Sequence, residues 1–206
     1  MYLLRRDKWA MIKQGQSDTR DLILKHAETL IRTRGYAGFS YADLSDLVKI
    51  RKPSIHYHFA TKEQLVVATL DVYCQRYKVA FVQICAQYSN ALDRIDAYSR
   101  IYLEGLDQGV GCLCAALAVE RDIIPQSLRA ALASFLRGHL EWLQSVYADG
   151  LKNGEVSAGR DPAAAAQLVL SALEGSLLVA RALDQPGGLN SVHASLRHMF
   201  QPDPDF

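Results

Sequence analysis

The sequence is poor in the features that mark secreted, membrane and metal-binding proteins. Its 206 residues include four cysteines, none in a Cys-x-x-Cys pair, which argues against a disulfide framework or a zinc knuckle and favours reduced thiols. Residues 1–14 interrupt their apolar side chains with charges, unlike a secretory signal. The apolar run at residues 163–173 is shorter than a membrane span. These absences predict a soluble, cytoplasmic protein with no membrane contact.

The alternating pattern of β-strands is also almost absent, whereas helical periodicity runs through most of the chain. No glycine-rich loop follows a strand, and no Cys, His and Asp residues are spaced as a catalytic set. We therefore predict an all-α protein of about nine helices that has no cofactor, no metal and no enzymatic activity. Hydrophobic residues make up 50% of the chain, which is enough to bury the core of one or two domains.

The formal net charge of +1 hides an uneven distribution. Residues 1–62 hold 12 Lys and Arg against 6 Asp and Glu, whereas residues 63–206 hold 11 against 16. A basic segment gains free energy by releasing counterions from a phosphate backbone, and an acidic segment is repelled by that backbone. Any polyanion that the protein binds is therefore expected at residues 1–62.

Two helices are predicted first in the basic part. One covers about residues 18–34 and ends at Gly35, which leaves residues 1–16 as a flexible tail. The next starts at Ser40, which forms a Ser-x-x-Asp capping pattern with Asp43. The inner face of this second helix is expected to contain Leu44, Leu47 and Val48.

The segment KIRKPSIHYHFATKEQL, residues 49–65, predicts a third, short helix. Its proline suits a first helical turn, and Ile55 and Phe59, four residues apart, share a face that would be buried. His56 and His58 cannot chelate one metal ion from this helix, because side chains two residues apart diverge by roughly 200°. The polar side chains therefore form either a solvated surface or a binding surface.

Two short helices joined by a tight turn, with a third helix before them and a basic charge, are typical of a helix-turn-helix unit. The stretch GYAGFSYADLSDLVKIRKPSIHYHFATKEQL resembles the N-terminal domain of the TetR family of bacterial repressors. It has the glycine-containing turn, a Ser-x-x-Asp-Leu-Ser second helix, a recognition helix that ends in Tyr-His-Phe, and a Lys-Glu helix start. It departs at Lys49, Arg51 and His56, where the family more often has Gly, Ser and Tyr, and these departures bear on the operator rather than the fold.

The resemblance implies a homodimer that binds a palindromic operator in double-stranded DNA through a recognition helix at residues 52–59. For each implied contact, the alternative is an ordinary solvated side chain. The residues implied to face base edges are Lys52, Pro53, Ser54 and His56. The residues implied to contact phosphates are Ser40, Tyr41, Tyr57, His58 and Lys62.

Residues 63–206 are predicted to continue as long helices, interrupted at Gly109 and Gly111 and resumed from Leu113. By the resemblance they form a ligand-binding and dimerisation domain, which follows a helix-turn-helix domain at residues 17–62. The last two helices, expected at residues 162–184 and 188–200, would pair with their copies in a second subunit as a four-helix bundle. The alternative for these helices is packing within one chain.

Members of the family hold a small-molecule effector in this second domain, which implies an unidentified effector here. The segment GCLCAALAVE, which contains Cys112 and Cys114, resembles a segment found in one subgroup of the family. In that subgroup, a cysteine at the start of the corresponding helix responds to electrophiles or oxidants. A thiol at a helix N-terminus has a lowered pKa and a larger thiolate fraction, although buried cysteines also serve as small hydrophobic residues. Other candidates to line a pocket, each also a candidate core residue, are Tyr98, Tyr102, Trp142 and Tyr147.

The sequence therefore favours a ligand-responsive or thiol-responsive transcriptional repressor. Two other functional classes are compatible with an all-α chain that contains cysteines. One is a thiol-dependent helical detoxification enzyme, and the other is a helical scaffold that binds proteins. Specific DNA binding that survives competitor DNA would distinguish the repressor from both.

Overall fold

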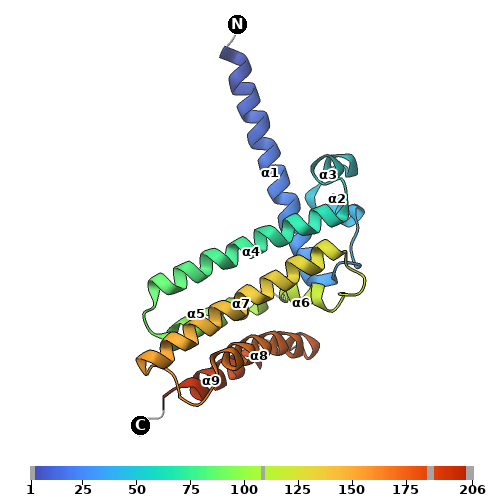
Figure 1. Cartoon of the computed structure of the whole chain (residues 1–206). Helices are drawn as coiled ribbons and strands as arrows, with labels where there is room; N and C mark the ends of the chain where they lie inside the picture. Colours follow the sequence, from blue (N-terminus) through green and yellow to red (C-terminus); the bar gives the residue numbers. More distant parts are fainter. Residues whose placement is uncertain (1–2, 108–109, 185–187, 203–206) are drawn as a thin grey trace.

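The computed structural model describes the backbone of residues 3–107, 110–184 and 188–202, and over these residues it contains nine helices and no strand (Figure 1). The all-α fold class is thereby confirmed. Gly109, at the predicted interruption, lies outside the described residues. The helices are α1 (Leu3–Arg34), α2 (Tyr41–Val48), α3 (Lys52–His58), α4 (Lys62–Gln87), α5 (Ala91–Asp107), α6 (Leu113–Ala118), α7 (Gln126–Asn153), α8 (Pro162–Ala182) and α9 (Gly188–Phe200).

The N-terminal helices begin and end where local chemistry predicts. Gly35 ends α1 with a φ of 76°, a left-handed conformation that glycine adopts without steric cost. Ser40 caps α2 in a complete capping box with Asp43: the serine side chain accepts from backbone N–H groups and the carboxylate accepts from the Ser40 N–H. Thr61 caps α4 by accepting from Gln64 N–H at 3.1 Å. The boundaries at Gly35 and Ser40 confirm the sequence prediction.

Helix α1 starts earlier in the chain than the sequence predicted. The helix begins at Leu3 and not near residue 18, so residues 3–16, expected as a flexible tail, continue α1 as helix. Figure 1 shows this part of α1 extending away from the other helices. The segment is rich in good helix formers, and its single Gly15 costs only about 1 kcal/mol relative to alanine, so nothing in it ends the helix.

Two of the three departures from the family pattern, Lys49 and Arg51, lie in the turn between α2 and α3. Lys49 ends α2 in the left-handed region, with φ 61°, where a glycine would avoid the steric cost of a β-carbon. Arg51 is the N-cap of α3 and makes no capping hydrogen bond with its side chain. Leu47, predicted to be buried, is 45% exposed, because it lies about 100° around the helix from Val48. Leu44, Val48 and Ile55 form the core of the turn instead.

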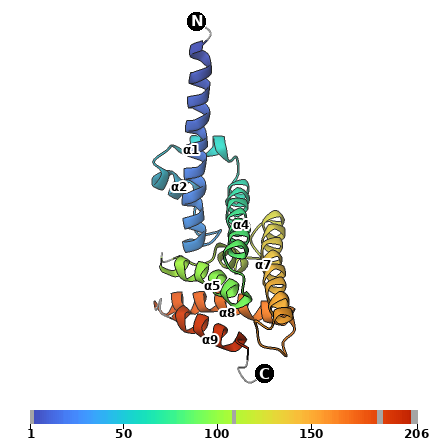
Figure 2. The ribbon, with the colours of Figure 1, turned by 90° about the vertical axis from the view of Figure 1, so that its left-hand side faces the viewer.

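The six remaining helices form the body of the molecule. The 26-residue α4, about 39 Å long, joins the N-terminal helices to the body and packs against α1, α5 and α7. Figure 2 shows α8 and α9 beyond α5, at the end of the molecule opposite the start of α1. Packing is most extensive between α7 and α8 and between α8 and α9. The body is therefore layered, with α4, α5 and α7 inside and α8 and α9 at its outer end.

Helix α8 is longer than the apolar run whose length argues against a membrane span. Among the described residues it is the one helix that is long and apolar enough to cross a membrane, since it runs on to Ala182 beyond the apolar run at residues 163–173. Length therefore does not exclude a membrane span. A single such helix is weak support for one, because the core helix of a globular protein has the same composition. One face of α8 packs on α7 and α9, which accounts for that part of its apolar surface.

Candidate functional site

The polar residues of α3 form an exposed surface on the N-terminal domain. Ile55 is fully buried and Phe59 is 4% exposed, as predicted, and together they fix which side of α3 faces outward. Tyr57 is 73% exposed. The His56 ring lies 4.7 Å from the ring of Tyr41, and its Nδ1 lies 3.3 Å from the Ala60 carbonyl oxygen. The residues that complete the exposed surface are Lys52, Pro53 and Ser54, with His58 half-buried beside it.

Three of the predicted phosphate contacts have side chains that are engaged within the domain. The Ser40 hydroxyl donates to Asp43 at 2.6 Å and accepts from the first N–H groups of α2. The Tyr41 hydroxyl donates to the Phe59 carbonyl oxygen at 2.9 Å, and burial raises the pKa of Tyr41 to about 12. The Lys62 ammonium group donates to the Phe39 carbonyl oxygen, so it is directed inward.

Lys62 is further held by aromatic rings. Its Nζ lies 4.2 Å from the ring centre of Phe39 and 4.9 Å from that of Tyr36, and burial lowers its pKa. A cation over two ring faces, with a carbonyl acceptor, is stabilised where it is. To reach a phosphate, Lys62 would have to leave these partners. In this structure it joins the start of α4 to the segment between α1 and α2.

The interior of the body, where Tyr98, Tyr102 and Trp142 were expected to line a pocket, is filled by aromatic side chains. Tyr98 is fully buried, and its hydroxyl pairs with His139 Nδ1 at 2.8 Å and with the Tyr102 hydroxyl at 3.0 Å. Trp142 stacks on Phe81 with ring centres 4.6 Å apart. Burial lowers the pKa of His139 to about 3, so its ring is neutral at pH 7. The aromatic rings pack on one another and leave this region as core.

Tyr147 is separate from this aromatic cluster. Its ring packs against Phe200 of α9 at 5.3 Å, and its hydroxyl donates to the Ser157 carbonyl oxygen at 2.9 Å. Ser157 N–H in turn donates to the Phe200 carbonyl oxygen at 2.9 Å. Tyr147 therefore holds the end of α7 to α9 and the turn before α8.

A cavity of about 370 Å³ lies between α6, α7 and α8, and both predicted cysteines line it. Cys112 is the N-cap of α6, as predicted, and Cys114 lies in the first turn. Both are buried, at 4% and 0% exposure, and both are free thiols. Most of the other lining residues are apolar, with two exceptions on α8: Glu174 and Arg181. The cavity brings a thiol, a carboxyl group and a guanidinium group together in apolar surroundings.

The groups around Cys112 favour its thiolate. Hydrogen bonds from Cys114, the Ala115 N–H, Glu174 and the Tyr73 hydroxyl, whose oxygen lies 3.7 Å from Sγ, lower the pKa of Cys112 to about 6 against the opposing effect of burial. Burial and the neighbouring Cys112 raise the pKa of Glu174 to about 9. The hydrogen bonds therefore favour the thiolate of Cys112, and burial favours the protonated form of Glu174 beside it.

Comparison with known proteins identifies the fold and its regulatory class. Residues 23–69 match the family described as bacterial regulatory proteins, tetR family, and residues 91–196 match the tetracyclin repressor-like C-terminal domain. The chain belongs to the TetR family. It is a DNA-binding transcriptional regulator, and α2 and α3 are its helix-turn-helix.

This TetR-family chain is similar to a regulator of the family from Agrobacterium tumefaciens, with a TM-score of 0.87, 28% identity, and coverage of 90% of this chain and 99% of that one. It is 26% identical to the transcriptional regulator AcuR of Cereibacter sphaeroides, over 77% of this chain and 74% of AcuR. It is 25% identical to IcaR of Staphylococcus epidermidis, the negative transcriptional regulator of the biofilm operon icaADBC, over 64% of this chain and 66% of IcaR.

In this TetR-family chain, the backbone beside Cys112 is bonded directly to the DNA-binding domain. Arg32 of α1 donates from Nε to the Gly111 carbonyl oxygen at 2.6 Å, and Arg181 donates to the Arg32 carbonyl oxygen at 3.3 Å. A β-carbon on Gly111 would lie 2.6 Å from Arg181 Nη1, so the contact is tight. The residue before Cys112 is therefore hydrogen-bonded to the last turn of α1.

The far end of α6 makes a second connection. Glu120 follows α6, and its carboxylate accepts hydrogen bonds from the backbone N–H groups of Tyr36 and Ala37, which follow α1. The segment from Gly111 to Glu120 thus contacts the end of α1 at both of its own ends. This segment joins the cysteine cavity to the helix-turn-helix domain.

Two polar residues of the cavity were missed in the sequence. Glu174 is the only acidic residue in α8, and Arg181 is the only basic one, in a helix that is otherwise apolar or small. An isolated acid in an apolar helix is a usable signal, because burying an unpaired carboxyl group is costly. The partner of Glu174 lies more than sixty positions earlier in the chain, so spacing could not reveal it.

We predict that the alkylation rate of Cys112 by iodoacetamide falls as the pH drops through about 6, because the thiolate reacts and its pKa is lowered to about 6 from the usual thiol value of about 8.5. The measurement is a pH profile by mass spectrometry in a Cys74→Ser/Cys85→Ser background. Tyr73→Phe removes one donor to the thiolate and should move the midpoint upward. Tyr147→Phe removes a buried tyrosine hydroxyl that bonds to Ser157 instead and is the matched control. A midpoint near pH 8.5 in the protein that keeps Tyr73 would contradict the lowered pKa of Cys112.

Proposed function

We propose that this regulator is a cytoplasmic, homodimeric repressor that releases its operator when an electrophile modifies Cys112. The observation that carries the proposal is the placement of Cys112: its thiol lines a cavity, and the carbonyl group of the residue before it accepts a hydrogen bond from α1. Repression is supported by the relative IcaR, which is named as a negative regulator.

The proposed DNA contacts lie on the exposed face of α3. Lys52, Pro53, Ser54 and His56 would face base edges in the major groove, where the N-terminal part of a recognition helix enters. Tyr57 and His58 would contact the backbone beside them. The side chains of Ser40, Tyr41 and Lys62 are already hydrogen-bonded within the domain, and we propose that they position α2, α3 and α4. These residues would contact phosphates only through atoms that those hydrogen bonds do not use.

Lys52→Ala is predicted to weaken binding to the operator about tenfold or more, because one base contact supplies about 1–3 kcal/mol of discrimination. The operator is first obtained by selection from random DNA, and affinity is measured by gel shift with excess competitor DNA. Lys152→Ala, which removes the same charge from the exposed last turn of α7, should leave binding unchanged. Equal losses in the two variants would refute the recognition role of Lys52.

The surface for a second subunit is proposed on α8 and α9. Leu178, Val179 and Leu183 are each more than half exposed, and Met199 of α9 is 42% exposed, so the pair of helices presents an apolar face that the chain itself leaves uncovered. A β-carbon at Gly175 would meet no atom within 4 Å, which leaves room for another helix to approach. A two-fold pair of such faces would place two recognition helices on two half-sites of a palindrome.

Val179→Glu is predicted to convert the dimer to a monomer, because the carboxylate would be buried without a partner at the interface. Val82 of α4 is 70% exposed, so Val82→Glu introduces the same residue away from that face and should remain dimeric. Sedimentation velocity distinguishes the two states. A Val179→Glu protein that sediments as the parent dimer would remove this face from the interface.

The proposed reaction at Cys112 needs no oxidant. The thiolate sulfur adds to the β-carbon of an α,β-unsaturated carbonyl compound, and the carbon–carbon double bond supplies the electron pair that moves to the α-carbon. Glu174 is protonated and lies in the same cavity, so it can give its proton to that carbon. The product is a thioether that occupies the cavity. Alkylation removes the negative charge to which the neighbouring groups donate, and the loss of these bonds would shift the segment between Gly111 and Glu120.

We expect N-ethylmaleimide to abolish operator binding by the Cys74→Ser/Cys85→Ser protein and to leave binding intact when Cys112→Ser is added. The assay is the gel shift with the selected operator, and mass spectrometry counts the adducts. One adduct per chain, with no further consumption of reagent, fits a sensor. Continued consumption with regeneration of the thiol would support the detoxification enzyme instead. Release of DNA by the Cys112→Ser protein would eliminate Cys112 as the switch.

A further inference from the structure

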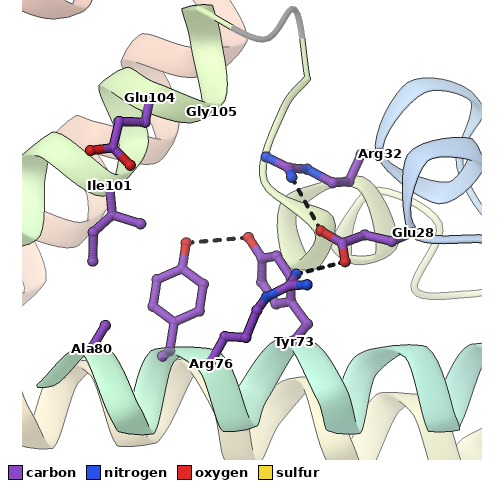
Figure 3. Close-up of a pocket in the computed structure, with 9 residues that line it drawn as sticks. Glu28, Arg32, Tyr73, Arg76, Ala80, Ile101, Glu104 and Gly105 are labelled. Atoms are coloured by element: carbon purple, nitrogen blue, oxygen red, sulfur yellow. Dashed lines mark hydrogen bonds and ion pairs between the residues drawn. The ribbon is translucent and has the colours of Figure 1, made fainter. Parts of the chain in front are cut away.

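A second cavity, of about 400 Å³, lies where α1, α4 and α5 meet (Figure 3). It shares no lining residue with the cysteine cavity. Tyr73 and Tyr77 form one side, and Ala80 and Ile101 extend the apolar part. The charged residues of the lining are Glu28, Arg32, Arg76 and Glu104. Its volume falls within the range of about 300 to 1,000 Å³ that small-molecule sites occupy.

Two guanidinium groups in this cavity share one carboxylate. Glu28 accepts from Arg32 Nη1 at 3.2 Å and from Arg76 Nη2 at 2.6 Å, and its side chain is only 12% exposed. Arg32 also binds the Gly111 carbonyl oxygen. Glu28, Arg32 and Arg76 together carry one net positive charge, and the exposed Glu104 on α5 brings the charge of the whole lining to zero. The cluster therefore has the charge and the donors to accept a second anion.

Arg76 is the arginine with free donors. It binds Glu28 through Nη2, and its Nε and Nη1 have no acceptor among the residues that the structure describes. Its side chain is 54% exposed, and its guanidinium carbon lies 5.3 Å from the ring centre of Tyr73, which orients the plane of the group. Figure 3 shows Arg76 beside Tyr73, with Ile101 and Glu104 across the cavity on α5. The free edge of a guanidinium group matches the two oxygens of a carboxylate.

We propose that this cavity is a second binding site, distinct from the cysteine cavity, for a small organic carboxylate. The carboxylate pairs with Arg76, and the apolar part of the ligand lies against Tyr77, Ala80 and Ile101. Glu104 opposes an anion, but it is exposed, so water and salt screen its charge. A cation is disfavoured because it would enter beside two guanidinium groups that share one carboxylate.

Binding at this site would compete with an ion pair between domains. Among the described residues, the pair of Glu28 and Arg76 is the one salt bridge that joins α1 to α4. An anion on the free Nε and Nη1 edge of Arg76 places a second negative charge beside Glu28 and so weakens the attachment of α1. The inference does not depend on the reactivity of Cys112, so either can fail without the other.

The test is calorimetric titration of the full chain with benzoate, with benzamide and benzylammonium as neutral and cationic probes of the same shape. We expect benzoate to bind about tenfold more tightly than either. Arg76→Gln should lose about tenfold in benzoate affinity. Lys78→Gln makes the same charge change on α4 outside the cavity and should keep the parent affinity. Glu104→Gln should bind about two- to fivefold more tightly, since one opposing charge is removed.

Several results would overturn the assignment: no binding of benzoate to the parent protein, a preference for benzylammonium, or equal benzoate affinity in folded Arg76→Gln and Lys78→Gln proteins. Circular dichroism checks that each variant is folded. If Arg76→Gln does not fold, Glu104→Gln decides the question, because its side chain is exposed and has no partner to lose among the residues described. An unchanged benzoate affinity in Glu104→Gln would then exclude the site.

Discussion

The hydrogen bond from Arg32 to the Gly111 carbonyl oxygen is the contact on which the regulatory design of this molecule depends. It joins the last turn of α1, which carries the helix-turn-helix domain, to the residue before Cys112. Glu120 adds a second contact at the other end of α6, on the backbone N–H groups after α1. The N-terminal domain is therefore held at both ends of the segment from Gly111 to Glu120, which is why a displacement of α6 is proposed to reorient the recognition helix.

The body supports this arrangement by having little free space in its centre. Eight aromatic or imidazole side chains from α4, α5 and α7 pack together, and tyrosine hydroxyl groups bond to one another, to His139 Nδ1 and to Glu174 Oε1. Space is found instead at the edges of this core: beside α6 and α8, and between α1, α4 and α5. Both cavities lie next to residues that bind α1. A ligand in either place therefore acts close to the joint between the domains.

The two cavities differ in the chemistry that they offer. The one beside Cys112 is mainly apolar and contains a thiolate with a neutral carboxyl group, so it suits an uncharged electrophile. The one beside Arg76 is polar, and the free donors of Arg76 are the reason for proposing an anion there. Tyr73 connects them, since its ring lies under Arg76 and its hydroxyl reaches Cys112. Tyr73 therefore lines one cavity and reaches a residue that lines the other.

The sequence by itself determined the helices of the N-terminal domain, their caps and the outward face of α3. Ser40, Thr61 and Gly35 act on neighbouring backbone groups, and the spacing of Ile55 and Phe59 reflects the helical repeat, so these features are local. The basic charge of residues 1–62 likewise needs no fold to be counted. Only the tertiary structure decided that Leu47 is exposed, that Lys62 faces inward and that the tyrosines fill the interior. It alone brought Glu174 to Cys112 and Arg76 to Glu28. The repeat of a helix says which residues share a face, but the neighbour of that face depends on contacts between distant parts of the chain.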